Sequence, residues 1–163
     1  MSLLEICQWL QDTQFGTSLR ESIWMFPIVE GTHVMALSLS VGTLLWMDLR
    51  LTGTFMKTQP MSKVSSSVLP WTLAGFAIMT ITGLLLFWCQ AVKAYNSIFF
   101  KMKVAMLFLA ALNAIAYHST IYLRMDEWDK AIPPPRRARW AGWCSIVLWI
   151  GIIICGRTMA YNF

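Results

Sequence analysis

Four long apolar runs constrain this chain more than any other feature, because a helix needs about 20 mostly apolar residues to cross ~30 Å of hydrocarbon. The clearest run, over residues 68–92, reads VLPWTLAGFAIMTITGLLLFWCQAV and carries no charged side chain. Three further runs cover about 23–47, 98–123 and 140–159. A segment surrounded by lipid has to satisfy its backbone hydrogen bonds internally. The sequence therefore predicts an all-α, integral membrane four-helix bundle.

Length and composition support this prediction and set the domain organisation. With 57% hydrophobic and 13% charged residues among 163 positions, the chain is too apolar for a soluble domain and too short to add a separate one. We expect residues 23–163 to form the membrane domain and residues 1–22 to form a short interfacial helix with a linker. Leu3, Cys7 and Leu10 would share one side of that helix. A mobile N-terminal tail is the alternative.

The distribution of Lys and Arg between the loops predicts the orientation of the spans. The loops after the first and third spans together hold eight of these residues, and the opposite side holds five. Because cytoplasmic loops carry the excess of basic residues, we expect an N-out/C-out topology. The net charge of +5 belongs to these loops and forms no continuous basic patch, so we expect no nucleic-acid partner.

Small residues at a spacing of four predict close helix contacts. Such pairs are Ser38 with Gly42, Ala110 with Ala114, and Gly151 with Cys155. Small side chains let helix backbones approach closely in lipid, where burial from water cannot drive association. The pattern predicts a tight bundle surrounded by the lipid bilayer, and it equally suits a homo-oligomer or a subunit of a larger membrane complex.

Ionisable residues inside the spans are candidates for a site, because such groups are costly in lipid. Glu30 and His33 lie one turn apart near the outer end of the first span, and Lys103 and Arg157 fall at a similar depth. One hypothesis is that this outer cluster is a functional site. The other is that these groups form contacts that only lock helices together. A Glu30–Arg157 ion pair would then join the first span to the fourth, and an Asp48–His118 contact would join the first to the third.

A b-type haem is the sharpest cofactor hypothesis, because membrane four-helix cytochromes hold haem between histidines on facing helices. The chain has only two histidines, His33 and His118, which we expect at depths about ten residues, or ~15 Å, apart. One iron cannot bridge that gap. His33 would therefore be the metal ligand, alone or with a methionine such as Met35, while Arg157 and Lys103 meet the propionates. The candidate cofactor-binding residues are His33, His118, Glu30, Lys103 and Arg157.

Two further ligands remain open at this stage. A copper site could use His33 with Cys89 and Cys155, since soft ligands suit Cu(I). A quinone or proton site could use Glu30 and His33 as acid and base. The sequence contains no HExxH, GxSxG or phosphate-binding glycine loop, and no Cys/His zinc pattern, so hydrolytic and nucleotide-driven enzymes are not favoured.

Several segments together resemble a known type of protein. They are FPIVEGTHVMALSLSVGTLLWMDLRLTG, ITGLLLF, NSIFFKMKVAMLFLAALNAIAYH and WIGIIICGRTMAY. Over about 24–162 the chain resembles a family of small four-helix bacterial inner-membrane proteins classed as a domain of unknown function. The resemblance rests on Glu30 with His33, on Asp48-Leu49-Arg50 and on Gly156-Arg157. It implies a multi-pass protein of the bacterial inner (cytoplasmic) membrane. The layout is also loosely similar to copper-resistance-D-type and cytochrome b-561-type membrane proteins, although a two-haem b-561 protein has four histidines.

Three functions follow from these observations. The leading hypothesis is a non-catalytic or redox-accessory inner-membrane subunit, an electron-transfer protein if haem binds, with a polar site near the outer face. The first alternative is a transporter or conduit for a small solute, a proton or copper. The second is a purely structural or assembly protein of the membrane.

Overall fold

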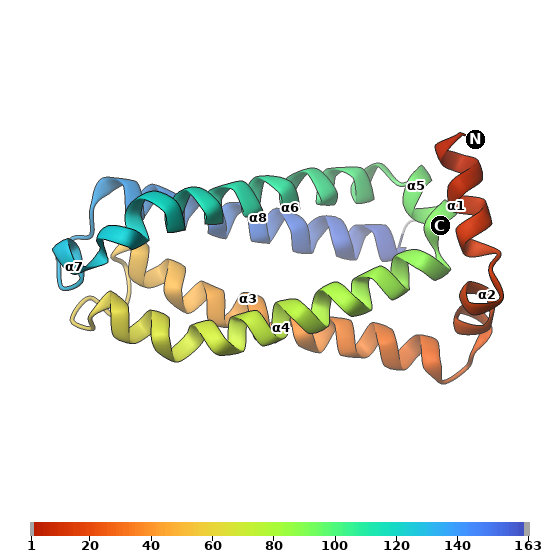
Figure 1. The fold of residues 1–163 in the computed structure, drawn as a ribbon, viewed down its shortest axis with the longest axis horizontal. Coiled ribbons are helices and arrows are strands. Elements are labelled where there is room, and N and C mark those ends of the chain that lie inside the picture. Colours follow the sequence, from red (N-terminus) through yellow and green to blue (C-terminus); the bar gives the residue numbers. More distant parts are fainter. Residues whose placement is uncertain (1, 162–163) are drawn as a thin grey trace.

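Four long helices form the body of the molecule. The computed structural model describes residues 2–161 and shows helices but no strand over that range. The long helices are α3 (Met25–Thr52), α4 (Met61–Cys89), α6 (Ile98–Ala116) and α8 (Arg136–Tyr161), and they lie side by side in Figure 1. Each belongs to a segment long and apolar enough to cross a bilayer. The predicted all-α membrane four-helix bundle is confirmed, and the chain is a multi-pass membrane protein.

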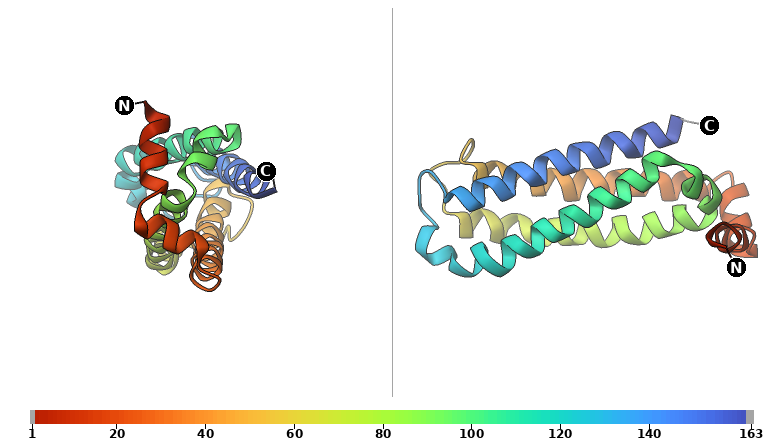
Figure 2. Two further views of the ribbon diagram at one scale, coloured as in Figure 1. Left: turned by 90° about the vertical axis from the view of Figure 1, so that its right-hand side faces the viewer. Right: turned by 90° about the horizontal axis from the view of Figure 1, so that it is seen from above.

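Short helices lie at both ends of the bundle. At one end, which we call the termini end, lie α1 (Leu3–Gln11), α2 (Gln14–Glu21) and α5 (Ala91–Asn96), at the same end of the bundle as the last turn of α8 (Figures 1 and 2). At the opposite loop end, α6 continues as a π-helical turn η1 (Tyr117–Ile121), a 3-10 turn η2 (Tyr122–Arg124) and α7 (Met125–Trp128).

Several helix boundaries differ from those expected from hydropathy. The first span continues beyond 47 to Thr52, and α4 begins at Met61 rather than 68. The reason is that polar residues at the loop end find partners inside the protein. Asp129 accepts hydrogen bonds from the Ser62 backbone N–H at 2.7 Å and from its hydroxyl at 2.9 Å, so an anion caps the first turn of α4.

Arg50 ties the two loops of the loop end together. Its side chain is 1% exposed, its Nε donates to the Gln59 carbonyl at 2.7 Å, and its guanidinium donates to the Asp129 carbonyl at 3.3 Å. A hydrophobic cluster packs beside this tie, formed by Met47, Leu51, Met61, Tyr117, Met125, Trp128 and Ala138. The loop end is therefore closed by a polar anchor set within an apolar core.

Glycines set the closest helix contacts. A Cβ atom on Gly75 of α4 would lie 2.9 Å from the Ser40 backbone nitrogen of α3. A Cβ on Gly142 of α8 would lie 3.0 Å from the Asp48 carbonyl oxygen, and one on Gly151 would lie 2.7 Å from the Met106 sulfur of α6. These three positions explain the packing of α3 on α4, of α8 on α3 and of α8 on α6.

The bundle is open on the side of α4 and α6. These two helices lack the packing that joins the other neighbouring pairs, although Phe87 and Phe100 stack between them with ring centroids 5.6 Å apart. No residue of α6 is fully buried, and large apolar side chains such as Phe108 are exposed on it. Such surfaces suit contact with the lipid bilayer.

Helices α1 and α2 cover the termini end. Trp88 of α4 donates from its indole N–H to the Thr13 hydroxyl at 2.9 Å, and Phe15 meets the Trp88 ring edge-on. Helix α1 runs across the end of the bundle (Figure 1), with Leu3 and Trp9 exposed. An exposed apolar face on a helix lying across a membrane bundle suits the interfacial location expected from the sequence, which stays a prediction.

Candidate functional site

One polar layer near the termini end receives a side chain from each of the four long helices. Its members are His33 of α3, Thr82 of α4, Lys103 of α6 and Cys155 of α8, and we call it the His33 layer. His33 Nδ1 lies 2.9 Å from Thr82 Oγ1. The Lys103 ammonium lies close enough to His33 and to Cys155 for an electrostatic interaction with each. The fold thus gathers four polar groups from distant parts of the sequence.

The hydrogen bonds of Thr82 assign the orientation of the His33 ring protons. The Thr82 hydroxyl donates a bifurcated hydrogen bond, to the Ile78 carbonyl at 2.7 Å and to the Met79 carbonyl at 3.2 Å. A hydroxyl has one proton to donate, so Thr82 Oγ1 accepts from His33 Nδ1–H. A neutral His33 then carries its lone pair on Nε2, which is the form in which imidazole binds a metal or accepts a hydrogen bond.

Lys103 brings a positive charge into this layer. Its side chain is half-buried, and its Nζ would lie 3.7 Å from a Cβ on Gly156 of α8. Within residues 2–161 no carboxylate forms an ion pair with it. A cation inside a membrane-spanning segment, without a counter-ion among residues 2–161, favours an anionic ligand.

Glu30 and Arg157, expected to belong to the same cluster, lie outside it. Both side chains are exposed. Arg157 donates to the Tyr161 hydroxyl at 3.0 Å and packs over its ring, while Glu30 forms no ion pair in the part of the chain that the structure describes. The expected Glu30–Arg157 pair is therefore wrong. Glu30 lies six residues before the buried Ala36, a turn of about 120° around α3, which places it on the flank of the helix.

His118 has a local environment at the other end of α6. Its Nδ1 lies 3.0 Å from the Ala114 carbonyl, and its ring stacks on Tyr122 with centroids 5.0 Å apart. The side chain is exposed, whereas Asp48 is 4% exposed, so the expected Asp48–His118 contact is wrong. His33 and His118 share no contact in the described chain, and His118 remains a cofactor ligand only as a prediction.

Asp48 is a buried acid that sequence reasoning placed at a membrane boundary. Its hydrogen-bonding partner is the Ser145 hydroxyl of α8, and Tyr117 lies near enough to interact electrostatically. Over residues 2–161 no basic side chain pairs with it. The signal was present in the helical spacing of Ala36, Ser40, Met47 and Leu51, a buried face that continues past Asp48 to the end of α3.

The side chains of the described chain offer no ready metal cage. Within residues 2–161 no three His, Cys, Asp or Glu side chains come together closely enough to hold an ion. His33, Cys89 and Cys155 thus do not form the copper site considered above.

Comparison with known proteins adds nothing to this geometry. The resemblance to a small inner-membrane family stays a prediction, and the residues that carry it divide between the layer (His33), its exposed surroundings (Glu30, Arg157) and the loop end (Asp48, Arg50). A search of protein-family models, of curated proteins and of solved structures gives no match to the chain.

Proposed function

We propose that the protein is a non-catalytic, redox-accessory subunit of a membrane, and that the His33 layer binds its electron-carrying ligand. The observation that carries this proposal is the convergence of four helices on one layer, where the His33 imidazole lies close to the Lys103 ammonium and no carboxylate among residues 2–161 pairs with Lys103. These are the two features that an anionic redox cofactor requires: a ligand for its centre and a cation for its carboxylates.

A b-type haem fits these donors better than a bare metal ion does. His33 would hold the haem iron through its imidazole, with Nδ1 held by Thr82, and Lys103 would meet a propionate. Bound haem supplies one-electron transfer. Arg157, turned towards Tyr161, does not join the layer in this structure. A methionine or a residue of another subunit would complete the protein ligands of the haem.

Absorption spectroscopy of the purified protein tests this function. We expect a Soret and an α band on reduction with dithionite, and we expect His33→Ala to lose both because it removes the free imidazole nitrogen. His118→Ala is the matched control and should keep the bands, since His118 lies on the exposed surface of η1. A wild-type protein from haem-supplied cells without these bands, or a His33→Ala variant that keeps them, contradicts the proposal.

Asp48 favours a second candidate, a conduit for protons or small cations. An unpaired carboxylate is costly in a membrane interior, so binding of a proton or a monovalent cation would offset that cost. On the α3–α4 interface, at a position of α3 between Asp48 and His33, the Thr43 and Thr72 hydroxyl oxygens lie 2.7 Å apart. Hydroxyl groups at such a position could conduct protons.

Flux into proteoliposomes tests the conduit. Asp48→Asn keeps the shape of the side chain but removes its charge, and we expect it to abolish proton flux. Glu30→Gln is the control and should leave flux unchanged, because Glu30 is exposed on the flank of α3. Wild-type flux equal to that of empty vesicles, or undiminished flux in Asp48→Asn, would rule the conduit out.

A further inference from the structure

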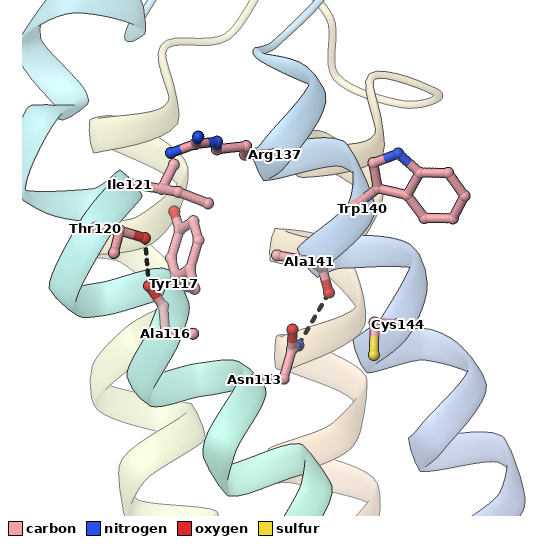
Figure 3. A pocket seen from close by; sticks show the side chains of 9 residues that line it. All are labelled: Asn113, Ala116, Tyr117, Thr120, Ile121, Arg137, Trp140, Ala141 and Cys144. Carbon is pink, nitrogen blue, oxygen red and sulfur yellow. Dashed lines mark hydrogen bonds between the residues drawn. The ribbon is translucent and has the colours of Figure 1, made fainter.

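A groove of about 370 Å³ lies on the side of the bundle between α6 with its π-helical turn η1 and the first half of α8. Figure 3 shows its lining, which comprises Asn113, Ala116, Tyr117, Thr120, Ile121, Arg137, Trp140, Ala141 and Cys144. None of these residues belongs to the His33 layer. The volume is within the range of small-molecule sites, roughly 300–1,000 Å³.

Local structure explains why the two helices separate here. Asn113 donates from its side chain to the Ala141 carbonyl at 3.0 Å and holds α6 against α8 at the lower edge of the groove. Above it the backbone changes from an α-helix to the π-helical turn Tyr117–Ile121. Such turns interrupt helix packing and often mark functional sites. The facing side chains, Ala116 and Ala141, are too small to fill the space.

The groove has a basic mouth and an apolar floor. Arg137 lies in the first turn of α8 with an exposed side chain, and in Figure 3 its guanidinium extends over Ile121 and the Tyr117 hydroxyl. No carboxylate pairs with Arg137 in the described chain. Tyr117 is 4% exposed, and its hydroxyl has no hydrogen-bond partner among the residues that the structure describes. Below this mouth the lining is apolar, apart from Asn113, Thr120 and the Cys144 thiol.

The depth of the groove matches the boundary between headgroups and acyl chains. Arg136, Arg137 and Arg139 begin α8, and the apolar part of the helix follows from Trp140, whose ring is 75% exposed. Arginines followed by an exposed tryptophan are typical of a membrane interface. Basic pockets between transmembrane helices at this level bind anionic lipid headgroups.

We propose that this groove is a binding site for one anionic phospholipid. The phosphate lies at Arg137, and one acyl chain follows the apolar floor between Ala116 and Ala141 towards Cys144. A lipid fits better than a free phosphate ion, because only a lipid covers the apolar floor as well as the cation. The site is independent of the His33 layer and of the function proposed for it.

Native mass spectrometry of the detergent-purified protein tests the site with phosphatidylglycerol, phosphatidylcholine and inorganic phosphate as probes. We expect wild-type protein to retain phosphatidylglycerol more tightly than phosphatidylcholine and to show no retained phosphate. Arg137→Gln should lower the affinity for phosphatidylglycerol about tenfold, as expected for the loss of a charge-assisted hydrogen bond. Arg139→Gln is the matched control and should leave the affinity unchanged, since Arg139 is exposed on the same helix but does not line the groove.

A second pair of variants tests the apolar floor. Ala116→Phe fills the groove and should displace the lipid, whereas Ala111→Phe places the same ring on an exposed part of α6 outside the groove and should not. The proposal is overturned if Arg137→Gln binds phosphatidylglycerol as tightly as wild type does. It is also overturned if phosphatidylcholine binds equally well, or if inorganic phosphate is retained to the same extent as the lipid.

Discussion

Replacing Arg50 with alanine is expected to lower the free energy of unfolding by about 3 kcal/mol, because two hydrogen bonds from a buried charged group are lost together. The carbonyls of Gln59 and Asp129 would lose their donor. The removed side chain is also 1% exposed, so a cavity would form beside the cluster around Met61. Thermal unfolding in detergent, followed by tryptophan fluorescence, measures the effect.

Two further variants show whether the geometry of Arg50 matters. Arg50→Lys should fall between wild type and Arg50→Ala, because one ammonium group replaces a planar fork that reaches two carbonyls. Arg136→Ala removes an exposed charge and should be nearly neutral. Equal stability of Arg50→Ala and Arg136→Ala would show that Arg50 does not anchor the loops.

The second large effect is expected at Gly75. In an ordinary helix, Gly→Ala stabilises by up to about 1 kcal/mol through helix propensity. At Gly75 the added Cβ would lie 2.9 Å from backbone and Cβ atoms of Ser40 and 3.1 Å from the Ala36 carbonyl oxygen. Overpacking of this kind costs about 1–3 kcal/mol, so α3 and α4 would move apart and Gly75→Ala should destabilise the protein.

Gly42 provides the matched control for Gly75. It also lies in a long helix, but a Cβ there meets nothing within 4 Å. Gly42→Ala should therefore raise the unfolding midpoint in detergent while Gly75→Ala lowers it. If both variants raise the midpoint, α3 and α4 do not approach each other at Gly75 as closely as the structure shows.

The four-residue spacing of small residues in the sequence did not distinguish the helix contacts that form from those that do not. Gly151 and Cys155 do lie in helix contacts, since Gly151 meets Met106 and Cys155 is buried. Ser38 and Gly42 have the same spacing but remain on the surface of the single chain. A small residue permits a close approach without specifying which neighbour will use it.

The candidate site was predictable in part. Ionisable residues are rare in apolar runs, so His33 and Lys103 could be named from the sequence. Both lie at a similar distance from the ends of their spans, which is consistent with the electrostatic interaction between them. Thr82 was missed because a hydroxyl in a span usually bonds to its own helix, as it also does here. Glu30 and Arg157 were assigned to the site by depth, but their helices turn them outward.

The number of spans and their approximate positions along the chain were determined by the sequence alone, because the thickness of hydrocarbon sets how many apolar residues each helix needs. Only the tertiary structure decided how each helix is rotated about its axis. In water, an apolar stripe marks the buried face of a helix. In lipid, the outer surface and the interior of the bundle are both apolar, so the pattern of apolar residues says little about which face of a helix is buried. Close packing at Gly75, Gly142 and Gly151 turns Asp48, Arg50 and His33 inward and leaves Glu30 on the flank.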